Sequence, residues 1–228
     1  MLNNPLKPEA RKILEIIPQT ELEWTFRVQN DKSIRHGQFM QISLPKIGEA
    51  PISISGFANG YADFTIRKVG KVTDELFNLK KGDSLFIRGC YGNGWPVDNF
   101  KDKNIVIIAG GTGVSPVKSL INMFYGQSNY AKEIYLILGF RNSKSMLFKD
   151  ELAAWKESKY FHTVYTLDHE DFVGCNRGLV TEYLKDIPFD SFKGQFECIV
   201  VGPPVMMGCT AAALVSKNVP EEKIWMSF

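Results

Sequence analysis

The stretch from Asn104 to Leu120, NIVIIAGGTGVSPVKSL, combines three structural signals in one short run. The uninterrupted apolar segment from Ile105 to Ala109 is typical of a parallel strand that is covered on both faces. Glycines follow, and a helix is expected to open near Ser115 and Pro116, because proline is tolerated in the first helical turn. Glycines before a helix N-terminus let the backbone approach a phosphate, which the free N–H groups and the helix dipole favour. The stretch therefore predicts a nucleotide-phosphate site; the alternative is a tight turn that binds no ligand.

The rest of the second half alternates apolar strands with helices. This alternation predicts right-handed βαβ crossovers and a doubly wound α/β parallel sheet. In such sheets ligands bind beyond the C-terminal ends of the strands, and three of the expected strands end in turns that should open onto one crevice. The expected strands are 133–139, 162–167, 198–202 and 224–226, and the expected helices are 146–157, 179–184 and a segment from Pro204 to about 217. The three turns are Ala109-Gly110-Gly111, Gly139-Phe140-Arg141 and Gly202-Pro203-Pro204.

The first half has a different pattern. Short runs of alternating apolar and polar residues, such as 24–28 and 40–44, are typical of half-buried strands. Five or six such runs predict a small N-terminal antiparallel β-barrel. One short helix, 74–79, is expected to be capped by Thr73. We therefore expect two domains, a barrel over residues 1–100 and an α/β domain over residues 101–228.

Composition narrows the function classes. The 228 residues are 44% apolar and 23% charged, as in ordinary globular proteins. A net charge of +2 gives no indication of nucleic-acid or membrane partners, and no apolar run reaches the roughly 20 residues that span a bilayer. The four cysteines lack metal-ligand spacing, and the three histidines form no catalytic pattern, so we expect no metal site and no catalytic histidine. Because no signal peptide is visible, a cytoplasmic location is expected.

Three segments of the first half carry candidate chemistry. The strand around 51–55 bears small hydroxyls, which could equally be the polar face of an edge strand. The glycine turn at 67–73 precedes a helix and has basic neighbours, so it predicts an anion site, with a solvated turn as the alternative. The loop 89–96 contains two aromatic residues and is a candidate wall for a flat ring, or else a linker.

Several common catalytic motifs are missing from the sequence. The glycine turn lacks the G-x-G-x-x-G spacing, and no acidic residue ends the next strand to hold a ribose. The absence of a Walker lysine argues against phosphoryl transfer, and the absence of a G-x-S-x-G elbow argues against a hydrolase.

The combination of a barrel with the motifs Gly-Gly-Thr-Gly-Val-Ser-Pro and Val-Gly-Pro-Pro-Val-Met resembles the ferredoxin–NADP reductase family over nearly the whole chain. Four segments are similar to one branch of that family, the B subunits of anaerobic sulfite reductase. The electron-transfer subunits of dihydroorotate dehydrogenase are a more distant resemblance. The four segments are 48–55, 69–73, 88–98 and 200–204.

The resemblance implies that the barrel binds FAD and that the α/β domain binds NADH or NADPH, with no side chain needed as acid or base. It implies that the glycine turn holds the pyrophosphate of the nicotinamide nucleotide, that 202–206 borders the nicotinamide, and that 140–141 lies near the adenosine. NADH is favoured because only Arg141 and Lys144 could form a 2′-phosphate site. The implied flavin residues are Pro51, Ile52, Ser53, Ile54, Arg67, Lys68, Val69, Gly70, Lys71, Val72 and Thr73. The implied nicotinamide-nucleotide residues are Gly110, Gly111, Thr112, Gly113, Pro116, Gly139, Phe140, Arg141, Gly202, Pro203, Pro204 and Met206.

The sequence departs from the family pattern in three ways. The flavin motif Arg-x-Tyr-Ser aligns with Ala50, Ile52 and Ser53, so the arginine is missing. Arg67, Lys71 and the backbone of 70–73 are expected to substitute for it. Val201 stands where the family usually has a cysteine beside the nicotinamide. The branch carries a cysteine-rich [2Fe–2S] segment after the last strand, which is expected to be missing from this sequence.

The resemblance implies hydride transfer from NADH to FAD, followed by electron transfer to the iron–sulfur and siroheme subunits of a sulfite reductase complex. The alternatives are an electron-transfer subunit of a hydrogenase or dihydroorotate dehydrogenase, or a docking or nucleotide-sensing subunit without catalysis.

Overall fold

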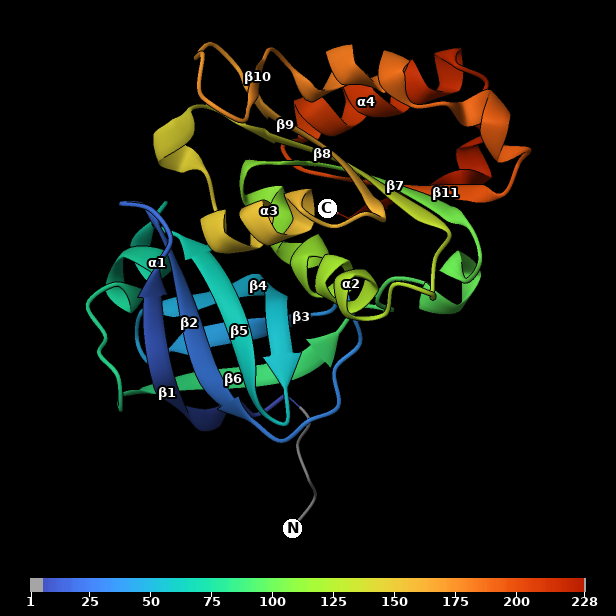
Figure 1. Cartoon of the computed structure of the whole chain (residues 1–228). Coiled ribbons are helices and arrows are strands. Elements are labelled where there is room, and N and C mark those ends of the chain that lie inside the picture. The colour runs from blue at the N-terminus through green and yellow to red at the C-terminus, as the bar shows by residue number, and fades with distance from the viewer. Residues whose placement is uncertain (1–5, 228) are drawn as a thin grey trace. The chain divides into compact units, whose positions relative to one another are not determined.

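The computed structural model describes residues 6–227, which fall into two compact units (Figure 1). One unit runs as far as Trp95 and also includes Ser115–Leu120. The other comprises Pro96–Val114 and the residues from Ile121 onward. Each unit contains its own sheet and its own cluster of buried apolar side chains.

The first unit is a closed barrel in which every neighbouring pair of strands is antiparallel. Its core follows from alternation along the strands: Phe26 on β2 lies opposite Phe64 on β5, and both are fully buried. The strands are β1 (Glu9–Pro18), β2 (Glu23–Asn30), β3 (Phe39–Leu44), β4 (Gly48–Ala58), β5 (Gly60–Arg67) and β6 (Ser84–Tyr91). Their order around the barrel is β1-β2-β5-β4-β3-β6.

The second unit contains a fully parallel sheet of six strands in the order β10-β9-β8-β7-β11-β12. Helices α4 and α3 lie on opposite faces of it (Figure 1). The strands are β7 (Asn104–Gly110), β8 (Glu133–Phe140), β9 (Phe161–Leu167), β10 (Asn176–Arg177), β11 (Phe196–Val201) and β12 (Ile224–Ser227). The α-helices of the chain are α1 (Lys71–Leu76), α2 (Ser115–Gly126), α3 (Lys149–Lys156) and α4 (Pro204–Ser216). Short 3₁₀ helices occupy Val97–Phe100, Gly111–Val114, Ser143–Ser145, Val180–Asp186, Phe189–Phe192 and Glu221–Lys223.

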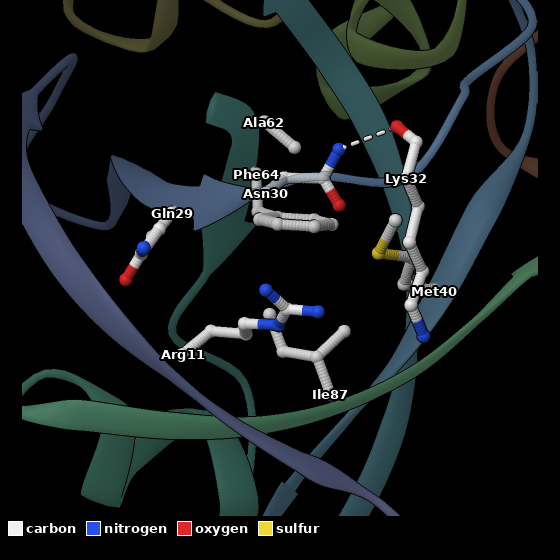
Figure 2. Close-up of a pocket in the computed structure, with 8 residues that line it drawn as sticks. All are labelled: Arg11, Gln29, Asn30, Lys32, Met40, Ala62, Phe64 and Ile87. Atoms are coloured by element: carbon white, nitrogen blue, oxygen red, sulfur yellow. Dashed lines mark hydrogen bonds between the residues drawn. The ribbon is translucent and has the colours of Figure 1, made fainter. Parts of the chain in front are cut away.

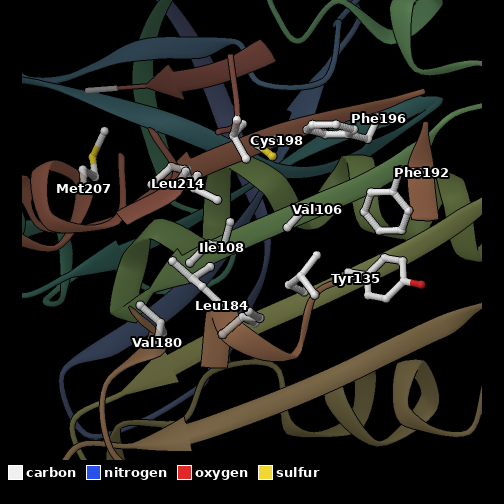
Figure 3. Close-up of a cluster of buried hydrophobic side chains, with 14 residues drawn as sticks. Val106, Ile108, Tyr135, Val180, Leu184, Phe192, Phe196, Cys198, Met207 and Leu214 are labelled. Atoms are coloured by element: carbon white, nitrogen blue, oxygen red, sulfur yellow. The ribbon is translucent and has the colours of Figure 1, made fainter. Parts of the chain in front are cut away.

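Alternate residues of the central strands build the core on one face of this sheet (Figure 3). Val106 and Ile108 of β7 pack there with Cys198 of β11, together with Met207 and Leu214 of α4. The intervening strand residues are buried on the opposite face, so the strands are covered on both sides and read as continuous apolar runs. The predicted fold class, an antiparallel barrel followed by a parallel α/β sheet, is therefore confirmed.

Two helix predictions need correction. Helix α1 begins at Lys71 rather than Asp74, because extended Gly70 takes the N-cap position and Thr73 lies inside the first turn. Helix α3 begins at Lys149 rather than Met146, because Phe148 adopts a left-handed conformation (φ 56°).

The segment predicted as a helix over 179–184 is a 3₁₀ helix, Val180–Asp186, and the two-residue strand β10 was not predicted. Among residues 6–227, none of the helices combines the length and the apolar character that crossing a bilayer requires.

Candidate functional site

The C-terminal ends of three central strands lie at the same level in the second unit. Gly110 of β7 pairs with Gly139 of β8, and Ala109 pairs with Val201 of β11. The turns that follow these strands therefore emerge along one edge of the sheet, as predicted. This is the edge at which parallel α/β sheets bind ligands.

The turns after β7 and β11 pack directly on each other. A Cβ built on Gly113 would lie 2.6 Å from the Val201 carbonyl oxygen and 2.7 Å from the Gly202 Cα. Because real Cβ atoms do not approach backbone atoms this closely, position 113 accepts only glycine at this spacing. This glycine thus serves protein packing.

Met206, in the first turn of α4, explains two more glycines. A Cβ on Gly110 would collide with its Sδ, and a Cβ on Gly202 would lie 2.7 Å from the same atom. The thioether therefore fills the space that side chains at these two positions would need. Packing within the protein, without any ligand, therefore explains the glycines at positions 110, 113 and 202.

Gly111 differs from the other glycines of the turn. Its φ of +55° lies in the left-handed region, and a Cβ there would meet no heavy atom within 4 Å. The glycine is required by backbone conformation, and the space beside it is open. Together with half-exposed Thr112, it forms the part of the motif that a ligand could approach.

The end of β8 is mostly closed by protein atoms. A Cβ on buried Gly139 would lie 2.5 Å from Val180 Cγ1, and the side chain of Phe140 is buried. The fully buried hydroxyl of Thr166, beside Gly139, has no hydrogen-bond partner within residues 6–227. Of the predicted residues at this strand end, only Arg141 is exposed.

The turn after β8 is tied to the loop after β9. The carboxylate of Glu170 accepts hydrogen bonds from Ser143 N, at 2.7 Å, and from Ser143 Oγ, at 2.8 Å. The backbone N–H of Ser143 is the main cause of a lowered pKa at Glu170, and its hydroxyl adds to the shift. The Asn142 side chain caps the same turn by accepting from Ser145 N at 3.0 Å.

The other predicted residues of the nucleotide site differ in exposure. Pro203 and Pro204, where α4 begins, are exposed. Pro116 is buried in α2, and its carbonyl accepts from the Trp95 indole N–H at 2.9 Å, inside the unit that contains both residues. Trp95 is itself buried, so in the 89–96 loop only Tyr91 leaves a partly exposed aromatic face.

The predicted flavin residues on β4 differ in how far their side chains are buried. Pro51 is exposed, and Ile52 and Ser53 are half-buried. The side chain of Ile54 lies in the barrel core, and its N–H donates to the Gln38 carbonyl at 3.0 Å. The accessible part of this segment is therefore 51–53.

The predicted anion-binding turn before α1 is held by Thr73. Its buried hydroxyl accepts hydrogen bonds from the backbone N–H groups of Val69 and Gly70 at 2.9 and 3.0 Å, and it donates to the Gly70 carbonyl. Two of the predicted phosphate donors are therefore already used. Within residues 6–227, the backbone N–H groups of Lys71 and Val72, which are the next donors along the turn, make no hydrogen bond.

The β4 segment and the turn lie close together, because α1 packs against β4 and β3. A Cβ on Gly48, at the start of β4, would lie 3.1 Å from Val72 Cγ2. The basic side chains of the turn are exposed, although the Arg67 Nε lies 3.4 Å from the Glu23 carboxylate. The structure thus places the turn before α1 against the start of β4, the strand that carries residues 51–54.

A small pocket in the barrel lies apart from every predicted residue (Figure 2). Its cavity volume is about 10 Å³, which is about the space of one water molecule. Its two cations are already paired: Arg11 with Glu9 and Asp31, and Lys32 with Glu9. The lining residues are Arg11, Gln29, Asn30, Lys32, Met40, Ala62, Phe64 and Ile87. Because the pocket offers no free charge, we assign it no ligand.

Comparison with known proteins decides the family. Residues 107–212 match the family described as "Oxidoreductase NAD-binding domain". The chain is 36% identical to sulfhydrogenase 1 subunit gamma of Pyrococcus furiosus over 239 residues, which cover 99% of this chain and 80% of that protein. The chain belongs to the ferredoxin–NADP reductase-like family of NAD-binding oxidoreductases.

Two further comparisons fit this reductase-like family. The chain is 30% identical to the probable dihydroorotate dehydrogenase B electron transfer subunit of Methanocella arvoryzae, over 92% of this chain and 74% of that protein. Its fold is similar to that of a ferredoxin NADP+ reductase from Neisseria gonorrhoeae with bound FAD and NADP. That comparison has a TM-score of 0.83 and 19% identity, and it covers 97% of this chain and 98% of the other. The two named relatives are a sulfhydrogenase subunit and a dihydroorotate dehydrogenase subunit, so the comparisons favour the hydrogenase or dihydroorotate dehydrogenase alternative over the sulfite reductase prediction.

Sequence reasoning missed one polar residue of this reductase-like chain and gave another a different role. Glu170 was not considered, because its partner Ser143 is 27 residues away and belongs to a different strand end. Thr73 was predicted, but as a helix cap and phosphate neighbour rather than as the acceptor that holds the turn. The spacing of Gly70 and Thr73 is the signal that could have indicated this closed turn.

Proposed function

We propose that the chain is a flavin-dependent, NADH-oxidising electron-transfer subunit of a multi-subunit enzyme of the hydrogenase or dihydroorotate dehydrogenase type. The similarity to sulfhydrogenase 1 subunit gamma over almost the whole chain carries this proposal. A sulfite reductase complex, with its iron–sulfur and siroheme subunits, is the finer assignment that the sequence motifs suggested. We also propose that the barrel, over residues 1–100, is the flavin domain and that residues 101–228 form the nicotinamide-nucleotide domain.

In the second unit, the open backbone at Gly111 and Thr112 would hold the pyrophosphate. Gly110, Gly113 and Gly202 would act indirectly, because their lack of side chains lets the turns and Met206 pack closely. The exposed start of α4, at Pro203 and Pro204, would border the nicotinamide, and the turn at Arg141 would lie near the adenosine. The contribution of the chain is to orient the nucleotide, because no acid or base is needed for hydride transfer.

In the first unit, the accessible residues 51–53 and the exposed turn before α1 would hold FAD. A bound flavin would supply a hydride acceptor that can pass electrons on singly. The open N–H groups of Lys71 and Val72, with the exposed side chains of Arg67 and Lys71, suit the phosphates of such a group. These residues fit the flavin, although the Thr73 hydroxyl takes up the N–H groups of Val69 and Gly70, which were predicted to bind the flavin phosphates.

The [2Fe–2S] cluster was expected only in a segment after the last strand that is missing from this sequence, and this stays a prediction. Among residues 6–227, no three His, Cys, Asp or Glu side chains are grouped so that they could hold a metal ion.

An anaerobic visible spectrum of the chain, recorded with added FAD before and after NADH, tests the proposal. We expect flavin bands that bleach on addition of NADH. A paired substitution of Arg67 and Lys71 by glutamine should weaken FAD binding, whereas the control Lys80→Gln, at an exposed lysine of the same unit, should not. Absence of flavin binding in the unmodified chain would contradict the enzymatic reading and favour the docking or nucleotide-sensing alternative.

The type of complex needs a separate experiment. The chain would be combined with the catalytic subunits of a hydrogenase, a dihydroorotate dehydrogenase or a sulfite reductase from one organism. NADH-dependent reduction through each would then be measured. The proposal requires activity with one of the first two, and activity with sulfite reductase alone would support the sequence-based assignment instead.

A further inference from the structure

The turn after β8 is filled by a side chain of the same chain. Both hydrogen-bond donors of Ser143, its N–H and its hydroxyl, bind the Glu170 carboxylate at 2.7 and 2.8 Å. The adjacent residues Arg141 and Lys144 are both exposed cations. A carboxylate thus occupies the donors of a turn whose neighbouring side chains are basic.

This turn lies where the proposed nucleotide site ends. Phe140, the last residue of β8, pairs with Leu167, the last residue of β9. The N–H of Asp168 donates to the Phe140 carbonyl at 3.1 Å, which holds the loop after β9 against the end of β8. Glu170 is therefore fixed at the C-terminal edge of the sheet, where ligands of parallel α/β sheets bind.

The Glu170 carboxylate holds a negative charge in a fixed position on this turn. The hydrogen bonds from Ser143 lower the pKa of Glu170, so the carboxylate is ionised at neutral pH. The cap between Asn142 and Ser145 fixes the same turn from the other side. A phosphate placed here would meet a like charge and would find the Ser143 donors taken.

We propose that Glu170 is a specificity residue that makes the chain select NADH over NADPH. It excludes the 2′-phosphate by its charge and by occupying Ser143, so that Arg141 and Lys144 do not form a phosphate site. This inference rests on the proposed nucleotide function of the second unit. It explains why two exposed cations beside the site need not indicate NADPH.

The substitution Glu170→Gln tests the charge with little change in shape. In the full chain, calorimetry would compare the affinities of adenosine 2′,5′-bisphosphate and AMP, and kinetics would compare kcat/KM for NADPH and NADH. We expect both ratios to move toward the 2′-phosphate by roughly tenfold, which corresponds to about 1.4 kcal/mol. The matched control is Asp171→Asn, because Asp171 is an exposed acid one residue along that pairs with Arg177.

A second variant separates charge from hydrogen bonding. Ser143→Ala removes one hydrogen bond and keeps the carboxylate, so it should keep the preference for NADH. Two results would overturn the role of Glu170 and leave the proposed nucleotide site intact. One is that Glu170→Gln still binds AMP but keeps the affinity and kcat/KM ratios of the unmodified chain. The other is that Asp171→Asn shifts these ratios by the same amount. If neither AMP nor the bisphosphate binds the unmodified chain, the nucleotide site itself fails, and both proposals fall. A shifted affinity ratio without any hydride transfer would support the role of Glu170 and contradict only the proposed redox function.

Discussion

The backbone of Gly113 lies so close to Gly202 that a Cβ on residue 113 would come within 2.7 Å of the Gly202 Cα. The two residues belong to turns that follow different strands, β7 and β11. Their contact therefore locks the ends of these strands together. In the same motif, Gly111 has open space beside it and is constrained only by its positive φ.

We expect Gly113→Ala to act mainly on stability and Gly111→Ala mainly on nucleotide binding. Gly113→Ala should lower the free energy of unfolding by roughly 1 to 3 kcal/mol, because the backbone must move to make room. Gly111→Ala should cost about 1 kcal/mol, from the left-handed conformation alone, but should weaken binding of NADH more strongly. Denaturant unfolding and nucleotide titration would measure both quantities. Equal losses of stability in the two variants would contradict this division of roles.

Thr73→Val should loosen the turn before α1. The hydroxyl accepts two backbone N–H groups, so its loss should reduce stability by about 1 kcal/mol, as for other residues that cap helix starts. We also expect weaker FAD binding, measured by flavin fluorescence during titration. Thr73→Ser keeps the hydroxyl and should behave like the unmodified chain. If Thr73→Val binds FAD with unchanged affinity, the closed turn does not contribute to the flavin site.

The stability of the chain should fall as the pH drops below about 6.5, through His36. Burial lowers the pKa of His36 from its ordinary value of 6.5, and its Nδ1 has no hydrogen-bond partner among residues 6–227. The unfolded chain then binds a proton at a higher pH than the folded chain, so protonation favours unfolding. Unfolding free energies measured between pH 7 and 5 should decline less in His36→Gln. Carboxylates such as Glu49, whose pKa is lowered by its hydrogen bond with Arg88, act only in more acidic solution.

The cysteines should differ sharply in reactivity. Cys209 on α4 is exposed, whereas Cys198 on β11 is fully buried, and burial raises the pKa of its thiol well above the usual range. Because the thiolate is the reactive form, we expect Cys209 to be alkylated under native conditions and Cys198 only after unfolding. Mass spectrometry after timed labelling would show this, and Cys209→Ser should remove the rapid reaction. Native labelling of Cys198 at the rate of Cys209 would contradict the buried position of β11.

Much of the fold could be predicted, because burial leaves a periodic trace in the sequence. The alternating apolar residues Phe26 and Val28 indicate a strand, and both lie in the barrel core, although Thr25 between Trp24 and Phe26 is buried as well. The run 105–109 indicates a strand buried on both faces. Helix starts were harder to predict. Gly70 and Thr73 are both acceptable at a helix start, and only the hydrogen bonds of the Thr73 hydroxyl show which residue caps α1.

The shared edge of the three strand ends could be predicted from the sequence, but not what each residue contacts there. A glycine that admits a ligand and a glycine that admits a methionine look the same in a sequence. Gly110 belongs to the second kind, because its neighbour Met206 comes from a distant turn. The contact between Ser143 and Glu170 likewise depends on the register of β8 and β9, which local patterns do not contain.

The pairing of β7 with β11 also has a consequence for how the protein is made. β7 is the central strand of the proposed nucleotide site, and one of its two neighbours follows only after β8, β9 and β10 have been synthesised. A nascent chain that has emerged only as far as β10 would have the glycine turn but neither Gly202 nor Met206 to pack against it. Contacts between such distant segments form slowly, because a long loop must close first. During translation, the proposed nucleotide site can therefore acquire its shape only when most of the second unit has left the ribosome.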